Sequence, residues 1–165
     1  MQFLETPFSL SKKKIQKKLW VKMKEDSIVK NDFQNELEEA RNFFSADKFA
    51  VATTGIQIDQ VGLHYASCSF EIRDFHTNGI GRVMGGAIFT LADFIFAVSA
   101  NRNGERAVTA SSQITYLNAA KGNVLKGQSR LIKDGKSLCI YEINIEDNLG
   151  TKVAIVTTTG MKIGG

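Results

Sequence analysis

Apolar residues recur at the spacing of one helix face early in the chain, at Phe33, Leu37, Ala40 and Phe44. Asn31 or Asp32 can cap the helix that this spacing predicts, and the helix should end near residues 45–47. A second helix is predicted from Gly85 to Asn101. Its residues are apolar on nearly every side, which is typical of a helix buried in a core.

Polar and apolar residues alternate with a period of two in most of the remaining sequence. Residues 49–61 and 63–72 are predicted as strands before the second helix. Four more strands are predicted after it, at residues 107–117, 123–133, 136–147 and 151–162. The Asp134-Gly135 pair is a two-residue hairpin signal, and short connections make consecutive strands antiparallel. The pattern predicts an α+β domain in which an antiparallel sheet wraps against a central helix.

The composition is that of a globular protein with one substantial core, since 43% of the 165 residues are hydrophobic and 23% are charged. No apolar run approaches the ~20 residues that span a bilayer, and we expect neither a secretory signal nor membrane insertion. Cys68 and Cys139 lie far apart and predict two reduced thiols in a cytoplasmic protein. Together with His64 and His76 they show no metal-ligand spacing.

Basic charge is concentrated at the start of the chain. Residues 1–30 hold eight lysines and three acidic residues, a net charge of +5, whereas the rest of the chain carries −1. We therefore divide the chain into a basic extension, residues 1–30, and a folded domain, residues 31–165. A short helix around Ile15, Leu19 and Met23 is solvated, packs on a partner or binds an anionic surface. The extension is too short for a complete helix-turn-helix, so nucleic acid is not the expected partner.

The glycine-rich segment before the second helix carries the strongest functional signal. It reads His-Thr-Asn-Gly-Ile-Gly-Arg-Val-Met-Gly-Gly over residues 76–86. Backbone N–H groups at a helix start have no partner within the helix, so those of Gly85 and Gly86 can point at a carbonyl oxygen or an anion. Because glycine has no Cβ, a substrate can approach this backbone and its developing oxyanion can be held there. The alternative is that both glycines only let the helix pack closely on the sheet.

Asp93 is a single carboxylate within the apolar helix, where it is costly unless it is paired, hydrogen-bonded or used. It lies eight residues after Gly85, about 12 Å along a helix and on nearly the same face. One helix therefore cannot bring its own Asp93 to a carbonyl bound at Gly85. If both act in one reaction, the site lies between two copies of the chain. The alternative is a structural aspartate that is hydrogen-bonded to backbone or to a hydroxyl such as that of Thr90 or Ser99.

Asn78 lies in the loop that leads to this helix and offers both a hydrogen-bond donor and an acceptor. It can orient a water molecule or a substrate carbonyl, and the alternative is an ordinary turn residue. His76, near the start of the loop, is more typical of a structural histidine. A dinucleotide fingerprint is excluded because Met84 replaces its third glycine and antiparallel hairpins follow.

The segment from residue 76 to residue 93 resembles the hot-dog thioesterases of the phenylacetate-degradation (PaaI-like) type. Their signature is close to H-x-N-x-x-G-x-x-H-G-G, followed by an aspartate seven residues after the last glycine. The residues that stand in register with it are His76, Asn78, Gly81, Gly85, Gly86 and Asp93. The resemblance covers about residues 31–162 and leaves the basic extension outside.

This resemblance implies a sheet wrapped around a long helix, with chains paired into homodimers and often homotetramers. It also implies hydrolysis of acyl-CoA thioesters at the dimer interface, with coenzyme A as part of the substrate and no metal or other cofactor. The Gly85 N–H would polarise the thioester carbonyl, and the partner subunit's Asp93 would activate water or attack directly. Asn78 would help to orient the reactants, and the hydroxyl of Thr109 would hold the water. Gly86 would contribute to substrate binding.

One position departs from the family pattern, since the histidine before the two glycines is Met84 here. A methionine at this substrate-binding position cannot donate a hydrogen bond and makes the pocket more apolar. If the family histidine acts as an acid or base, its loss costs about 10²–10⁴ in rate. The alternative function is therefore a non-catalytic acyl-CoA-binding or sensor protein with the same fold.

Overall fold

The structure, a computed structural model, describes residues 18, 19, 22, 32–102 and 104–164. The compact unit that holds the sheet spans Leu37–Gly165. The division predicted after residue 30 falls among residues outside this description, as does almost all of the basic helix predicted around Ile15, Leu19 and Met23.

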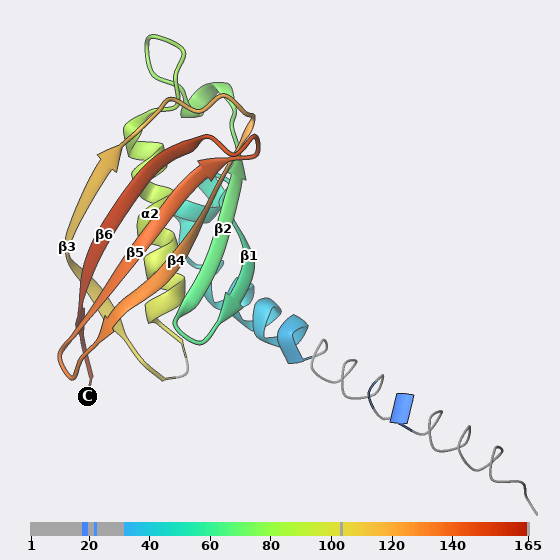
Figure 1. Cartoon of the computed structure of the whole chain (residues 1–165), viewed down its shortest axis with the longest axis vertical. Helices are drawn as coiled ribbons and strands as arrows, with labels where there is room; N and C mark the ends of the chain where they lie inside the picture. Colours follow the sequence, from blue (N-terminus) through green and yellow to red (C-terminus); the bar gives the residue numbers. More distant parts are fainter. Residues whose placement is uncertain (1–17, 20–21, 23–31, 103, 165) are drawn as a thin grey trace, which may run out of the picture. The chain divides into compact units, whose positions relative to one another are not determined.

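Six antiparallel strands form one sheet in the order β1-β2-β4-β5-β6-β3. Their bounds are β1 Gln57–Gly62, β2 Tyr65–Glu71, β3 Ala107–Tyr116, β4 Val124–Asp134, β5 Leu138–Asp147 and β6 Lys152–Lys162. The long helix α2, Gly85–Ala100, lies behind the sheet in the view of Figure 1 and is crossed by its strands. The predicted α+β class and the predicted central helix are confirmed.

The prediction of one strand over residues 49–61 is wrong for its first half. Residues Lys48–Thr53 form a turn of π-helix, η1, and β1 begins only at Gln57. The side chain of Asp47 caps this turn by accepting a hydrogen bond from the Ala50 N–H at 3.1 Å. Gly55 then reverses the chain with φ of +71°, a conformation that glycine adopts without strain. A capped helical turn therefore prevails over the alternating pattern.

The hairpin between β4 and β5 also differs from its prediction. β4 ends at Asp134 and β5 begins at Leu138, so residues 135–137 connect them, in place of the two-residue turn predicted at Asp134-Gly135. The Gly135 N–H donates to the Leu138 carbonyl at 2.8 Å and closes this connection. The strands on either side keep the predicted antiparallel pairing.

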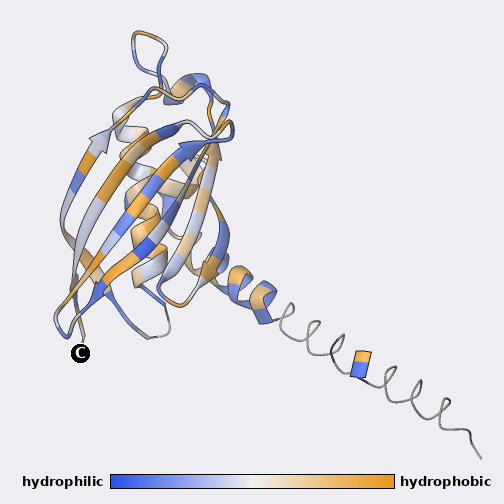
Figure 2. Ribbon diagram, in the orientation of Figure 1, coloured by the Kyte–Doolittle hydropathy of each residue, from blue (hydrophilic) through white to orange (hydrophobic). Residues whose placement is uncertain are grey.

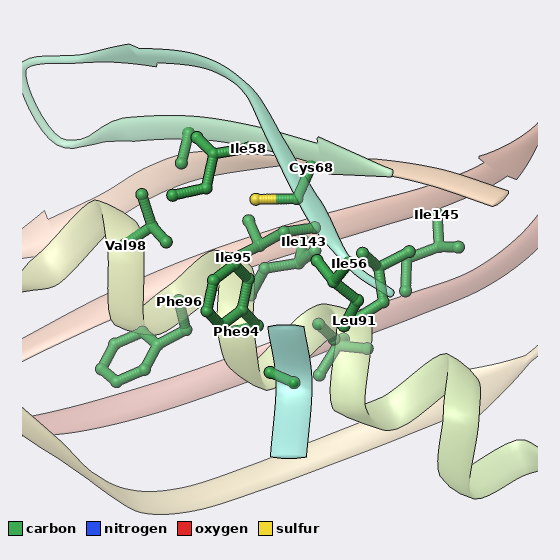
Figure 3. Close-up of a cluster of buried hydrophobic side chains, with 14 of the residues drawn as sticks. Ile56, Ile58, Cys68, Leu91, Phe94, Ile95, Phe96, Val98, Ile143 and Ile145 are labelled. Carbon is green, nitrogen blue, oxygen red and sulfur yellow. The ribbon is translucent and has the colours of Figure 1, made fainter. Parts of the chain in front are cut away.

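The core lies between α2 and the inner face of the sheet. Side chains of α2 such as Leu91, Phe94 and Ile95 meet inward-facing residues of β1, β2 and β5 (Figure 3). Figure 2 shows the same arrangement by hydropathy: α2 is largely apolar, and apolar and polar residues alternate along the strands. Cys68 and Cys139 belong to the same core as free thiols, and burial raises the pKa of the Cys68 thiol. The prediction that they remain unpaired is confirmed.

A buried polar link fixes the position of α2 along the sheet. The Ser99 hydroxyl bonds the Ser129 hydroxyl of β4 at 2.8 Å. Ser129 in turn accepts a hydrogen bond from the Ala66 N–H of β2 at 2.9 Å. These two hydrogen bonds connect the C-terminal end of α2 to β4 and, through Ser129, to β2. They also satisfy the buried polar atoms, which would be costly without a partner.

The two edges of the sheet differ in how they are covered. At β1, the Arg41 guanidinium donates to the Ile58 carbonyl from two nitrogens, at 3.1 and 2.9 Å. At the other edge, β3 is long and most of its residues are exposed. An uncovered edge strand of this length is a template for pairing with another strand.

Gly160→Ala is expected to destabilise the protein, because a Cβ at this position in β6 would meet the ring of Phe96 and lie 2.8 Å from Cys139 Sγ. Overpacking of this kind costs about 1–3 kcal/mol, which urea denaturation would measure as a lower midpoint. Gly79→Ala is the matched control, because a Cβ there meets nothing within 4 Å. Equal midpoints for the two variants would contradict the described packing.

Candidate active site

The start of α2 offers two unused backbone donors. Met84 occupies the N-cap position without a side-chain hydrogen bond to the helix. Its carbonyl accepts from the Ala87 and Ile88 N–H groups at 3.0 and 3.2 Å. Within the residues that the structure describes, the Gly85 and Gly86 N–H groups have no hydrogen-bond partner. The positive end of the helix dipole is therefore presented together with two free donors.

Gly85 packs closely against the end of β3. A Cβ on Gly85 would lie 2.8 Å from the Tyr116 hydroxyl oxygen, at the end of β3. That hydroxyl donates a hydrogen bond to the Gly85 carbonyl at 3.0 Å. Gly86 is more open, since a Cβ there would meet only the Met84 side chain, at 3.4 Å. The two interpretations of the glycines, close packing and an accessible backbone, therefore both hold at Gly85.

Asp93 is not buried in the core, although the helix is apolar on most sides. Its side chain is exposed and accepts a hydrogen bond from the Thr109 hydroxyl of β3 at 3.0 Å. The alternative partners are excluded, because the Thr90 hydroxyl donates to the Gly86 carbonyl and Ser99 bonds Ile95 and Ser129. The exposed face of α2 that carries Asp93 is thus oriented towards β3.

Thr109 reaches Asp93 because β3 contains a bulge. Thr109 pairs with Gly160 and Ser111 pairs with Thr159, so Ala110 is an extra residue in the ladder. Thr109 thereby shares the inner face of the strand with Tyr116. The structure thus brings two separately predicted site residues, Asp93 and Thr109, into hydrogen-bond contact.

Asn78 acts within its own loop in this structure. Its side-chain oxygen accepts from the Ile80 and Arg82 N–H groups, both at 3.1 Å, and its own N–H donates to the Arg82 carbonyl at 2.7 Å. These bonds shape the loop that stands out at the top of Figure 1. The side-chain oxygen of Asn78 is therefore used in the way expected of a turn residue. Of its side-chain polar atoms, the amide nitrogen remains available to a substrate.

His76 is a buried structural residue. Its Nδ1 accepts from the Arg73 N–H at 3.0 Å, and its Nε2 bonds the Thr54 carbonyl at 2.9 Å. Both ring nitrogens are therefore used to connect the loop to the residues that follow η1. The structural interpretation of His76 is confirmed.

A pocket of about 420 Å³ lies beside the helix start. Its lining is mostly apolar and includes Val83, Gly85, Ile88, Tyr116, Leu117 and Ala120. A mostly apolar pocket with a few convergent polar groups is typical of a small-molecule site.

The buried carboxylate of Asp147 holds the wall of this pocket in place. It accepts hydrogen bonds from the Lys121 and Gly122 N–H groups at 2.7 and 2.9 Å, and from those of Leu149 and Thr151, each at 2.9 Å. Burial by itself would raise the pKa of Asp147, but these amide hydrogen bonds outweigh it and hold the pKa well below its usual range. The chain that follows Ala120 is thus anchored by an ionised group.

The two polar pairs lie at different levels of one helix. Gly85 with Tyr116 marks the first turn of α2, and Asp93 with Thr109 lies two turns later, about 12 Å along the axis. Residue types and spacing pointed to Asp93 and Gly85, and the family resemblance pointed to Thr109, but neither indicated Tyr116. Nothing local distinguishes its hydroxyl, because its partner is 31 residues away in the chain.

A family model described as thioesterase superfamily matches residues 80–154, which include the helix start, Asp93, Thr109 and Tyr116. Over this segment, just under half of the chain, the sequence matches the thioesterase superfamily. The acyl-coenzyme A thioesterase PaaI of Escherichia coli is 28% identical over 129 residues, which are 78% of this chain and 91% of PaaI. Human acyl-coenzyme A thioesterase 13 is 29% identical over 52% of this chain, and the chain spans only 64% of that protein.

Solved structures agree with this match in their fold. The structure of E. coli PaaI has a TM-score of 0.73 at 23% identity and covers 79% of this chain and 96% of its own. A Streptococcus mutans protein bound to acetyl-CoA has a TM-score of 0.63 at 28% identity and covers 67% of this chain and 90% of its own. The thioesterase fold expected from the resemblance, the hot-dog fold, is thereby confirmed. Among the helices that the structure describes, none is long and apolar enough to cross a membrane.

Asn78→Ala is expected to lower the free energy of unfolding by about 1 kcal/mol, because two loop N–H groups lose their acceptor. Asn78→Asp keeps an acceptor oxygen at the same place and should remain close to the original stability. Urea denaturation of both variants measures the difference. Equal losses in the two would mean that the side-chain oxygen does not hold this loop.

Proposed function

We propose that this thioesterase-superfamily protein hydrolyses acyl-CoA thioesters to a free acid and coenzyme A. The observation that carries the proposal is the pair of free N–H groups at Gly85 and Gly86 beside a mostly apolar pocket, on the same helix as the exposed Asp93. The similarity to PaaI, named an acyl-coenzyme A thioesterase, supports the substrate class. The acetyl-CoA bound to the related S. mutans protein supports it as well.

The active site of this proposal lies between two chains. An unbroken α2 keeps Gly85 and Asp93 of one chain about 12 Å apart, so a second chain must supply one of them. In an antiparallel pair of α2 helices, Gly85 faces the partner subunit's Asp93 when the two-fold axis passes near Phe89, midway between them. Gly86, Thr90 and Asp93 follow one another at helical spacing on the face available for this contact.

The contacts of the edge strand β3 are consistent with the same two-fold axis. Tyr116 lies beside Gly85 and Thr109 lies beside Asp93, so the axis that relates the two helix positions crosses β3 between them, near Ser112 and Gln113. β3 is exposed there, and antiparallel pairing with its copy would continue the sheet across a homodimer. A homotetramer would add a second contact between such dimers.

In the proposed reaction, the Gly85 N–H donates to the thioester carbonyl oxygen and stabilises the negative charge that develops there. The partner subunit's Asp93, oriented by Thr109, takes a proton from a water molecule whose oxygen bonds to the carbonyl carbon. The carbon–sulfur bond then breaks, and the proton passes to the coenzyme A thiolate. Direct attack by the carboxylate, followed by hydrolysis of a mixed anhydride, uses the same groups. The amide nitrogen of Asn78 is the group left to orient the reactants.

Met84 favours a second function, binding of acyl-CoA without hydrolysis. It replaces the family histidine at the N-cap of α2, its side chain is exposed, and it offers no hydrogen-bond donor. The backbone donors and Asp93 do not depend on that histidine, so we place hydrolysis first. The two buried free thiols suit a reducing compartment, and we propose a cytoplasmic location.

Asp93→Asn is expected to lower kcat by about 10²–10⁴, because the amide keeps the size of the side chain but cannot take a proton. The measurement is free-thiol release from short, long, aromatic and hydroxylated acyl-CoAs. Asp59→Asn is the matched control, since Asp59 also accepts a hydroxyl hydrogen bond, from Ser69 at 3.1 Å, but lies on β1.

A chelator should leave the rate of thiol release unchanged, because the proposal uses no metal. Binding of acyl-CoA without thiol release from the unmodified protein would establish the second function instead.

A heterodimer of Asp93→Asn and Gly85→Val chains tests the shared site. Each homodimer should be inactive, because valine at residue 85 would meet the Tyr116 hydroxyl and cover the backbone donor. The heterodimer, purified with two affinity tags, has both changes in one site and none in the other, so about half of the wild-type activity should return. An inactive heterodimer would place the whole site within one chain.

A further inference from the structure

We propose that Tyr116 is a positioning residue for the backbone donors of this site, and the inference rests on the proposed thioester hydrolysis. Its hydroxyl holds the Gly85 carbonyl at 3.0 Å and so fixes the first turn of α2 against the end of β3. Tyr116 would act on the reaction through Gly85 and Gly86, without touching the reacting atoms.

The start of α2 needs such an anchor. Two consecutive glycines open the helix, and each is about 1 kcal/mol less favourable in a helix than alanine. Met84 at the N-cap contributes no side-chain hydrogen bond that would offset this cost. Left alone, a helix start of this composition would fray, and the direction of its free N–H groups would vary.

Tyr116 provides a rigid support because it belongs to the sheet. It pairs with Ala154 of β6, and the next residue, Leu117, donates its N–H to the Val153 carbonyl at 2.9 Å. The Thr90 hydroxyl supports the following carbonyl, that of Gly86, at 2.9 Å. Thr90 lies on α2 itself, so among the residues that the structure describes only Tyr116 connects these two glycines to another element by a hydrogen bond.

The position of the hydrogen bond also matters electronically. The Gly85 carbonyl and the Gly86 N–H belong to the same peptide group. A peptide whose carbonyl accepts a hydrogen bond is more polarised, so the Gly86 N–H becomes a stronger donor. The Gly85 N–H, the donor of the proposed reaction, gains in orientation from the same hydrogen bond. Donors that are already oriented when charge develops on the substrate oxygen stabilise the transition state without reorganisation. Loss of the Tyr116 hydroxyl should therefore lower kcat more than it changes KM.

Tyr116→Phe removes the hydroxyl and keeps the ring that lines the pocket. We expect kcat to fall about 10- to 100-fold with KM within about 2-fold, less than the ~10²–10³ lost with a whole oxyanion donor. Amide hydrogen exchange at Ala87 and Ile88, which donate to the Met84 carbonyl, should become faster as the helix start loosens. Tyr65→Phe is the matched control, because the Tyr65 hydroxyl bonds Gln128 at 3.4 Å, away from α2.

Hydrogen exchange separates this inference from the proposed function. If the unmodified protein cleaves no thioester, the proposed hydrolysis fails, and faster exchange in Tyr116→Phe alone would still support the anchoring role. Unchanged exchange in Tyr116→Phe overturns the inference, whatever the activity. A higher KM with unchanged kcat also overturns it, because Tyr116 would then bind the substrate directly.

Discussion

The burial of one long apolar helix against a single sheet is the constraint on which this structure depends. The inner side chains of α2, among them Leu91, Phe94 and Ile95, are almost completely buried, and the Ser99–Ser129 hydrogen bond holds the helix in register with β4. Removing so much apolar surface from water keeps the helix in place, and α2 is one unbroken helix from Gly85 to Ala100. As a consequence, Gly85 and Asp93 cannot approach each other within one chain, and any chemistry that uses both must be shared between chains.

The edge strand β3 positions the candidate site residues of the buried helix α2. It supplies the hydroxyls of Thr109 and Tyr116 to α2, one at the carboxylate and one at the helix start. The same strand forms the uncovered edge of the sheet. Pairing of two β3 strands would therefore organise both groups of the proposed reaction in one step, since each hydroxyl already bonds its group within its own chain. In the proposed reaction, a change in β3 would therefore alter the groups that α2 presents to the substrate.

The site could be predicted from the sequence to an uneven extent. The glycine pair and Asp93 were singled out because a helix terminus and a carboxylate within an apolar helix carry strong physical expectations, although the Asp93 side chain is exposed in the structure. The partner of Asp93 was predicted less well, since Thr90 and Ser99 were considered from the residues and Thr109 was placed only by the family resemblance. For Asn78, the alternative that was weighed against a catalytic role fits the structure. Its side-chain oxygen accepts hydrogen bonds from backbone N–H groups of its own loop, as in an ordinary turn residue. A local pattern cannot tell which of several nearby hydroxyls or amides will be a given group's partner.

The sequence by itself determined the element types and the chemistry of α2, because periodicity and glycine placement act over a few residues. It predicted α2 to within one residue at its C-terminal end and the four later strands with similar bounds. It did not reveal that residues 48–53 form a helical turn, where the Asp47 cap prevails over the alternating pattern. The tertiary structure alone decided that β3 pairs with β6 at the sheet edge, and that Tyr116 and Thr109 thereby reach α2. Such contacts join residues far apart in the chain, and their energies depend on the packing of the whole sheet against the helix.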